Sequence, residues 1–177
     1  LVDCEPKIFF EWKREDEKFI QLSTKKKADF PELKIKEMDN PNVNAESIIV
    51  AISTTRRIKK HQLKDFGEQD VIEIYLDDCN DNNITYIKQL QNYRKVILDE
   101  LEALGRKNYP HLNQINLVAS IPSCMSLEIG RMIAQNNNRV KKIVAYHFVN
   151  QGTKLYPFGI AVTESQGQYK KGELIQN

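Results

Sequence analysis

Short apolar runs rich in β-branched residues recur over residues 47–163, and segments with helical spacing separate them. Continuous runs of this length are typical of strands that are covered on both faces of a sheet. They predict strands at Ile48–Ile52, Val71–Leu76, Ile115–Ala119, Val140–Phe148 and Leu155–Val162. Turn residues at 150–152 join the last two runs, which therefore predict an antiparallel hairpin.

Helical spacing predicts a short helix over Ile58–Phe66, a long helix over Ile84–Leu104 and a third over Leu127–Ile133. Pro122 stops the strand before the third helix, and Ser123 is expected to cap that helix through its hydroxyl. Strands and helices thus alternate with short connections. This order predicts an α/β fold, a mostly parallel sheet flanked by helices with an antiparallel edge hairpin.

Two segments lie outside this pattern. Residues 1–46 are interpreted as a β-rich or loop segment of the same domain, in which Lys7–Trp12 and Phe19–Leu22 predict two strands around a charged turn. The lysine-rich connection that follows, up to Pro41, is either a solvated loop or a flap over a site or an oligomer contact. Residues 166–177 predict a polar tail, so the core of the domain is expected at 47–165.

Composition narrows the possible functions. The formal net charge of +2 at pH 7 argues against nucleic-acid binding driven by total charge. No apolar run approaches the length needed to span a membrane. The three cysteines lack metal-ligand spacing and favour a reduced, cytoplasmic setting without a disulfide framework. Because the first residues, from Leu1, resemble the middle of a domain, we expect a piece of a longer protein with a domain missing upstream.

Little in the sequence indicates catalysis or metal binding. No two of the three histidines have metal-ligand spacing, and Asp77, Asp78 and Asp81 are typical of a turn. The patterns of a nucleophile elbow, a phosphate-binding loop and a dinucleotide fingerprint are missing. Cys124 has no clear partner histidine. We therefore expect no catalytic residue, no metal and no cofactor in this chain.

Better candidates for binding lie where two predicted strands end. In open α/β sheets, ligands bind at the carboxyl ends of the strands, and helix N-termini there bind anions. Both loops carry small hydroxyl residues, which suit phosphate or ribose. The candidates are Ser53, Thr54, Thr55, Arg56, Arg57 and Lys60 in the first loop and Pro122, Ser123, Cys124 and Met125 in the second.

A basic cluster follows the first strand. Arg56, Arg57, Lys59 and Lys60 are predicted in the first turns of a helix, where the macrodipole disfavours cations by a few tenths to about 1 kcal/mol. A bound anion would offset this repulsion, so the cluster indicates a phosphate site. A solvated basic face is the alternative.

Aromatic residues on the same side of the predicted sheet are candidates for stacking on bases. Ordinary packing in the core and the hairpin is the alternative for them. They are Tyr146, His147, Phe148 and Tyr156, with Trp12 as a weaker candidate.

Taken in order, these pieces resemble the SAVED domain, a relative of the CARF family of cyclic-nucleotide sensors, over roughly residues 48–163. Val50–Ile58 is similar to the first strand of the family and its loop. His147 stands where the family usually has an acidic residue. The rest of the resemblance rests on Leu117–Ala119, Pro122-Ser123, Leu127 with Gly130, Tyr146-His147-Phe148, and Tyr156-Pro157 before Phe158–Val162.

The resemblance implies a Rossmann-like (CARF-like) fold and a non-catalytic sensor of a bacterial anti-phage system of the CBASS type. Its ligand would be a cyclic oligonucleotide second messenger, with a cyclic dinucleotide of the cyclic GMP–AMP type expected first and a cyclic trinucleotide second. Binding would drive homo-oligomerisation and activate a fused effector, for which an upstream HNH endonuclease that contacts DNA is expected. A ring nuclease that cleaves the messenger and an interaction module without a small ligand stay open as alternatives.

Overall fold

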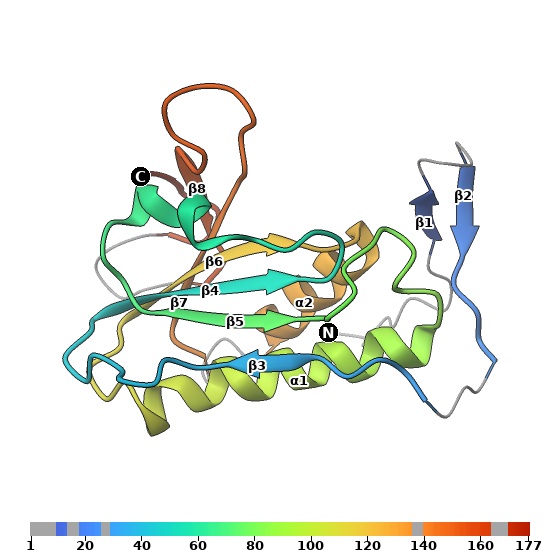
Figure 1. Cartoon of the computed structure of the whole chain (residues 1–177), viewed down its shortest axis with the longest axis horizontal. Helices are drawn as coiled ribbons and strands as arrows, with labels where there is room; N and C mark the ends of the chain where they lie inside the picture. The colour runs from blue at the N-terminus through green and yellow to red at the C-terminus, as the bar shows by residue number, and fades with distance from the viewer. Residues whose placement is uncertain (1–9, 14–17, 26–28, 136–139, 164–169) are drawn as a thin grey trace.

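The computed structural model describes residues 10–13, 18–25, 29–135, 140–163 and 170–177. Cys4, the first part of the predicted strand Lys7–Trp12 and residues 164–169 of the chain lie outside these ranges. In the described ranges, strands β1 to β9 and helices η1, α1 and α2 follow one another in the order that Figure 1 colours from blue to red.

Parallel strands form the centre of a seven-stranded mixed sheet, with the order β3-β5-β4-β6-β7-β8-β9 (Figure 1). The parallel strands are β4 (Ser47–Ser53), β5 (Val71–Tyr75), β6 (Gln114–Ser120) and β7 (Lys142–Tyr146). The antiparallel strands are β3 (Lys34–Lys36) at one edge and β8 (Phe158–Ala161) and β9 (Leu174–Gln176) at the other. The α/β class and the β7–β8 hairpin are confirmed, but antiparallel strands occupy both edges instead of one.

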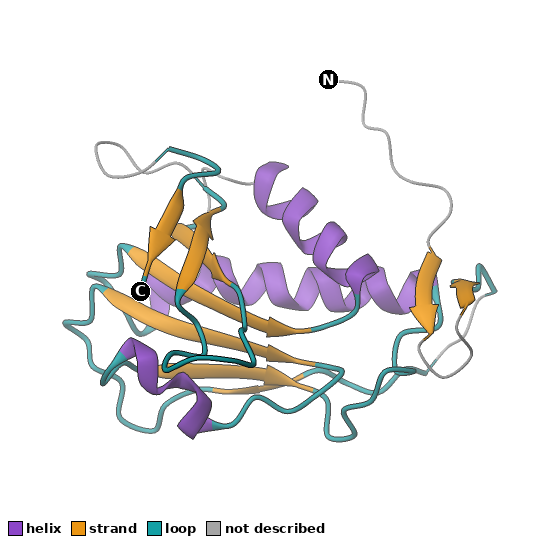
Figure 2. Cartoon of the chain, turned by 90° about the horizontal axis from the view of Figure 1, so that it is seen from above, coloured by secondary structure: helices purple, strands orange, loops and turns teal. Residues whose placement is uncertain are grey.

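Helices cover the two faces of the sheet unequally. α1 (Ile87–Lys107) and α2 (Ser123–Gln135) lie on one face, and the short 3-10 helix η1 (Lys60–Phe66) lies on the other (Figure 2). β4 shows why both faces are filled, because its apolar residues alternate between them. Those at positions 48, 50 and 52 join the larger core under α1 and α2, and those at 49 and 51 join the smaller core under η1.

A separate hairpin lies beyond the carboxyl ends of the parallel strands (Figures 1 and 2). Its strands are β1 (Phe10–Lys13) and β2 (Lys18–Gln21), which pair antiparallel as predicted, and β1 lies against α2.

The strand order reverses between β4 and β6. β5 lies on one side of β4 and β6 on the other, so the chain leaves these two neighbours in opposite directions. Such a switch point opens a crevice at the carboxyl ends of the two strands, where α/β folds usually bind ligands.

Two strands at the edges of the sheet were not predicted. The lysine-rich connection contains β3, and the expected polar tail contains β9, whose Ile175 is buried against β7 and β8. An edge strand pairs through its backbone and tolerates charged side chains, so it leaves little apolar pattern. In β3 those side chains form ion pairs, Lys34 with Asp77 at 2.6 Å and Lys36 with Glu73 at 3.8 Å.

The predicted helix starts also need correction. η1 begins at Lys60, so Arg56, Arg57 and Lys59 precede the helix, and the macrodipole argument for an anion beside them is wrong. At α2 the carbonyl of Pro122 accepts the N–H of Ser126 at 3.0 Å. Pro122 therefore takes the capping position that was predicted for Ser123, because the cap residue accepts the first helical bond.

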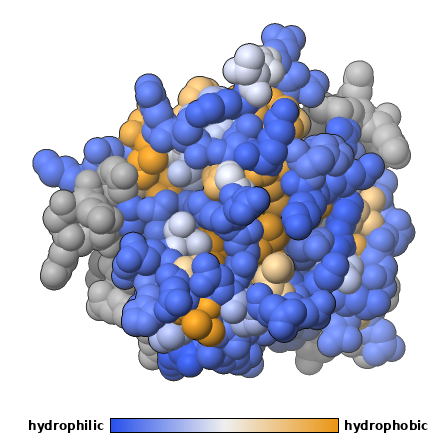
Figure 3. Space-filling view, turned by 60° about the vertical axis from the view of Figure 1, so that its left-hand side comes forward, coloured by the Kyte–Doolittle hydropathy of each residue, from blue (hydrophilic) through white to orange (hydrophobic). Residues whose placement is uncertain are grey.

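The surface in Figure 3 is mainly hydrophilic, and hydrophobic residues form small, separate areas on the side shown. No helix in the described ranges is both long and apolar enough to cross a bilayer.

An ion-pair cluster joins the two α-helices. Glu128 of α2 is 1% exposed, and its Oε2 lies 2.5 Å from Nη1 of Arg94 on α1 and 3.2 Å from Nη2 of Arg131. The cluster helps to hold α2, and so its N-terminus, in place over the sheet.

Replacing Glu128 with alanine removes the carboxylate from two largely buried guanidinium groups. We expect the free energy of unfolding to fall by about 2–3 kcal/mol in urea denaturation, below the upper range for fully buried pairs because both arginines keep some solvent contact. Glu102→Ala is the matched control, since its partner Arg106 is 4.0 Å away and 76% exposed, and should cost less than about 0.5 kcal/mol. Equal losses in the two variants would contradict the role given to Glu128.

Candidate functional site

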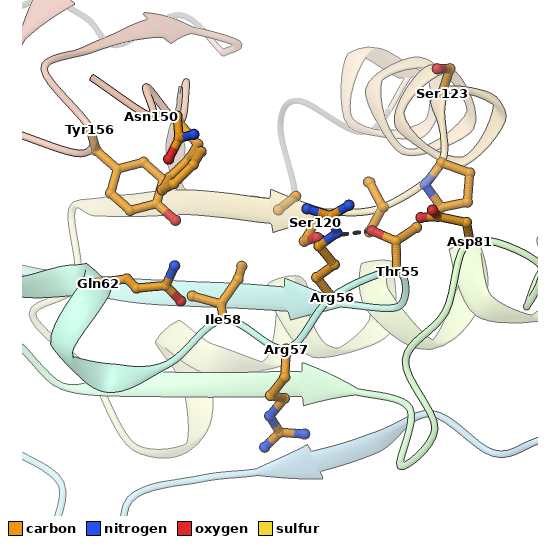
Figure 4. A pocket seen from close by; sticks show the side chains of 14 residues that line it. Thr55, Arg56, Arg57, Ile58, Gln62, Asp81, Ser120, Ser123, Asn150 and Tyr156 are labelled. Atoms are coloured by element: carbon orange, nitrogen blue, oxygen red, sulfur yellow. Dashed lines mark hydrogen bonds between the residues drawn. The ribbon is translucent and has the colours of Figure 1, made fainter. Parts of the chain in front are cut away.

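An open groove of about 820 Å³ lies at the switch point, over the carboxyl ends of β4 and β6 (Figure 4). Its walls come from the loop after β4, the end of β6 with the start of α2, and the β7–β8 connection. The lining residues are Thr55, Arg56, Arg57, Ile58, Gln62, Asp81, Ala119, Ser120, Ile121, Pro122, Ser123, Phe148, Asn150 and Tyr156.

Hydrogen bonds tie the first two walls together. The carbonyl of Ser120 accepts the N–H groups of both Thr54 and Thr55 at 3.0 Å. The hydroxyls of Thr55 and Ser120 are 2.9 Å apart. The loop after β4 is also closed on itself, because the hydroxyl of Ser53 accepts the N–H of Ile58 at 3.0 Å. The N–H groups of Thr54 and Thr55 are thus already paired, which leaves side-chain hydroxyls to meet a ligand.

The two arginines of this loop differ in their surroundings. Arg57 turns away from the groove (Figure 4), with its Nη2 2.5 Å from Glu73 and its guanidinium carbon 3.3 Å from the centre of the Tyr75 ring. Arg56 is exposed, points toward Ser120 and forms no ion pair with any described residue. Of the two, Arg56 is the cation that can meet an anion in the groove.

The N-terminus of α2 borders the same end of the groove. Ser123 is exposed there, and the first N–H groups of a helix this long carry a partial positive charge. Asp81 lies opposite, on the loop after β5 (Figure 4). That loop is fixed to the end of β4, because the carbonyl of Thr54 accepts the side-chain amide of Asn83 at 2.8 Å.

The other end of the groove is aromatic. Phe148 is 40% exposed, and its ring meets that of Tyr156 edge-on at 5.6 Å. Asp65 of η1 holds this wall, because its Oδ2 accepts the backbone N–H groups of Leu155 at 2.5 Å and Tyr156 at 2.8 Å. Burial, with a smaller contribution from the charge of Asp65, raises the pKa of Tyr156 above its ordinary value. The phenol therefore remains a neutral O–H group at neutral pH.

The structure brings part of the predicted site together in one groove. Thr55, Arg56, Arg57, Pro122, Ser123, Phe148 and Tyr156 line it.

The remaining candidates lie elsewhere. Ser53 and Thr54 are buried beside the loop, and Cys124 and Met125 are buried in the core under α2. Tyr146 packs edge-on against Phe66, and His147 stacks on Phe158. Lys60 is exposed on η1, and Trp12 belongs to β1; neither is among the lining residues.

Other lining residues were not predicted from the sequence. Ala119 and Ser120 could have been found, because they directly precede the second predicted loop; Ile121 was expected in that loop but was not named as a binding candidate. Ile58 was assigned to the predicted short helix and to the segment that resembles the family, but not to the site. No sequence motif marks the remaining three lining residues, Gln62, Asp81 and Asn150. They line the groove only because the folded chain brings their segments together there. Among the described residues, no cluster of histidine, cysteine, aspartate or glutamate could hold a metal ion.

The fold and the groove together define an α/β domain with an open groove at the carboxyl ends of its parallel strands. The model of the SAVED family, the SMODS-associated and fused to various effectors sensor domain, matches residues 1–162. The chain therefore belongs to the SAVED family of sensor domains. No curated protein sequence is significantly similar to it.

Three solved structures of the Acinetobacter baumannii Cap4 SAVED/CARF-domain receptor are similar in fold. One holds the cyclic trinucleotide 2′3′3′-cAAA (TM-score 0.53, 18% identity), and another holds 3′3′3′-cAAA (0.54, 15%). The third is the receptor named without a ligand (TM-score 0.51, 16% identity). They cover 74–76% of this chain, which spans only 25–29% of their length.

Asp65→Asn should loosen the aromatic wall while leaving the rest of the sheet intact. An amide oxygen accepts the N–H groups of Leu155 and Tyr156 more weakly than a carboxylate, so we expect a loss of about 1–2 kcal/mol in stability. Hydrogen exchange should become faster at these two amides, and the pKa of Tyr156 should fall because a nearby negative charge is gone. Asp99→Asn, an exposed change on α1, is the control. Unchanged exchange at both amides would show that Asp65 does not hold this wall.

Proposed function

We propose that this chain senses a cyclic oligonucleotide second messenger, which binds in the groove over β4 and β6. The observation that carries the proposal is the division of the groove. Arg56, the hydroxyls of Thr55 and Ser120 and the N-terminus of α2 suit a phosphodiester, and Phe148 with Tyr156 suits a base.

The comparisons support the same class of ligand. The family is one of sensor domains, and two of the similar structures hold cyclic trinucleotides. Both ring sizes belong to the proposal: a cyclic dinucleotide of the cyclic GMP–AMP type, and a cyclic trinucleotide as in the Cap4 receptors. Ligand binding would promote oligomerisation and so activate a fused effector, for which an HNH endonuclease is the proposed partner.

Isothermal titration calorimetry of the purified chain tests this function. The titrants are cyclic di- and trinucleotides that contain adenine, guanine or both, with linear dinucleotides of the same bases as controls. We expect saturable binding of at least one ring and weaker binding of its linear form. A folded chain that binds none of the rings would overturn the proposal.

Arg56→Ala should weaken binding of the tightest ring by about 10–100-fold, because a charge-assisted hydrogen bond contributes about 1.5–3 kcal/mol. Lys95→Ala, the same loss of charge at an exposed site on α1, should change affinity less than about twofold. Arg57→Ala should act chiefly on stability, because that side chain is engaged by Glu73 and Tyr75. Equal affinity losses in the Arg56 and Lys95 variants would remove Arg56 from the site.

Ser123→Trp should block the groove at the start of α2 and reduce affinity at least tenfold without a large loss of stability, because the side chain is exposed. Ser126→Trp is the matched control, since Ser126 is exposed on the same helix outside the lining residues. Tight binding by the Ser123 variant would show that the ligand lies elsewhere.

A further inference from the structure

Gln62 presents a hydrogen-bond donor of fixed direction at the aromatic end of the groove. Its Oε1 accepts the backbone N–H of Lys59 at 2.8 Å. A backbone N–H can only donate, so the amide atom that faces it must be the oxygen, and the amide cannot turn over without losing this bond. The NH₂ group of Gln62 is therefore the part that remains for a ligand.

Tyr156 adds a second donor beside it. Its hydroxyl points into the groove, and the amide nitrogen of Gln62 lies on the side that faces Tyr156 (Figure 4). The phenol keeps its proton at neutral pH, because burial and Asp65 raise its pKa. A ligand in this part of the groove thus meets an N–H and an O–H donor.

The surroundings of the two donors favour a flat, partly apolar ligand group. Phe148 lies edge-on to Tyr156, and Ile58 is 8% exposed among the lining residues. Aromatic rings stack on nucleobases of every kind, so stacking alone would not choose a base. The preference for one base over another must therefore come from the hydrogen-bond donors.

Nucleobases differ in what they offer to such donors. The Hoogsteen edge of guanine carries two acceptors, O6 and N7. Adenine places its N6 amino donor beside N7. That amino group would face the NH₂ of Gln62 without an acceptor, and leaving a polar group unpaired on binding lowers the affinity.

We propose that the aromatic end of the groove is a subsite for a 6-oxopurine base of the cyclic oligonucleotide, guanine in the first place, and that Gln62 determines this specificity by donating from its NH₂ group to O6 or N7. The proposal rests on the proposed function, because it names the base that the same groove selects.

Calorimetry with rings matched in size and linkage tests the base preference. The probes are cyclic di- and trinucleotides that contain only guanine, only hypoxanthine or only adenine. Hypoxanthine keeps O6 and N7 but lacks the 2-amino group, so it should bind like guanine. We expect both to bind about tenfold or more tightly than adenine. Equal affinities, or a preference for adenine, would overturn the subsite.

Gln62→Glu provides the sharper test. One carboxylate oxygen can still accept the N–H of Lys59. The other oxygen replaces the NH₂ group, so a hydrogen-bond acceptor stands where the wild-type side chain has a donor. The ratio of guanine to adenine affinity should fall by about tenfold or more and turn in favour of adenine, whose amino group can now donate. The added negative charge weakens all rings alike, so the ratio is the quantity to compare.

Two further variants complete the design. Gln62→Met removes the donor without supplying an acceptor and should bring the ratio near one. Gln91→Glu makes the same charge change on α1, outside the groove, and should leave the ratio unchanged. Circular dichroism checks that each variant is folded.

The outcomes separate the two proposals. If the wild-type chain binds none of the rings, both the function and the subsite are overturned. If it binds a ring but Gln62→Glu leaves the base ratio as it was, the sensing function stands and the specificity role of Gln62 is overturned.

Discussion

The parallel pairing of β4 with β6 is the constraint on which the groove depends. The two strands run in register to their last residues, where Ser53 lies opposite Ser120. The carbonyl of Ser120 then continues the pairing past the strands by accepting the N–H groups of Thr54 and Thr55. The chain leaves these neighbours in opposite directions, so a crevice forms between two loops whose separation is set by sheet hydrogen bonds. The spacing of the loops therefore resists changes in their side chains.

The interior of this sheet was predictable, and its edges were not. A strand covered on both faces must be apolar at consecutive positions, and the sequence of β4 shows this from Ile48 to Ile52. β3 and β9 are held by backbone pairing at the margins, where Lys34 and Lys36 form ion pairs in water instead of joining the core. Composition cannot distinguish such strands from loops. The strand order also depends on contacts between distant segments, which local patterns do not contain.

The candidate site was predictable where it follows directly from a strand. Thr55 and Ser123 line the groove because each comes just after the end of a parallel strand. Single residues within the loops were harder to place. Arg56 and Arg57 are neighbours in the chain, but only Arg57 forms an ion pair with Glu73 on β5, whereas Arg56 is exposed. Gln62 reaches the groove only because η1 folds back over the sheet.

Ligand recognition in this groove would depend more on the orientation of hydrogen-bonding groups and aromatic rings than on net charge. The net charge of the chain is small, Arg57 is neutralised by Glu73, and Asp81 lies at the same end as Arg56. Long-range attraction of an anion is therefore weak, and screening by salt reduces it further. The N-terminus of α2, the loop hydroxyls, the NH₂ of Gln62 and the rings of Phe148 and Tyr156 act only over short distances and only in set orientations. A site built in this way would discriminate between ligands of equal charge by their hydrogen-bonding edges, as the proposed sensing of one messenger among related nucleotides requires.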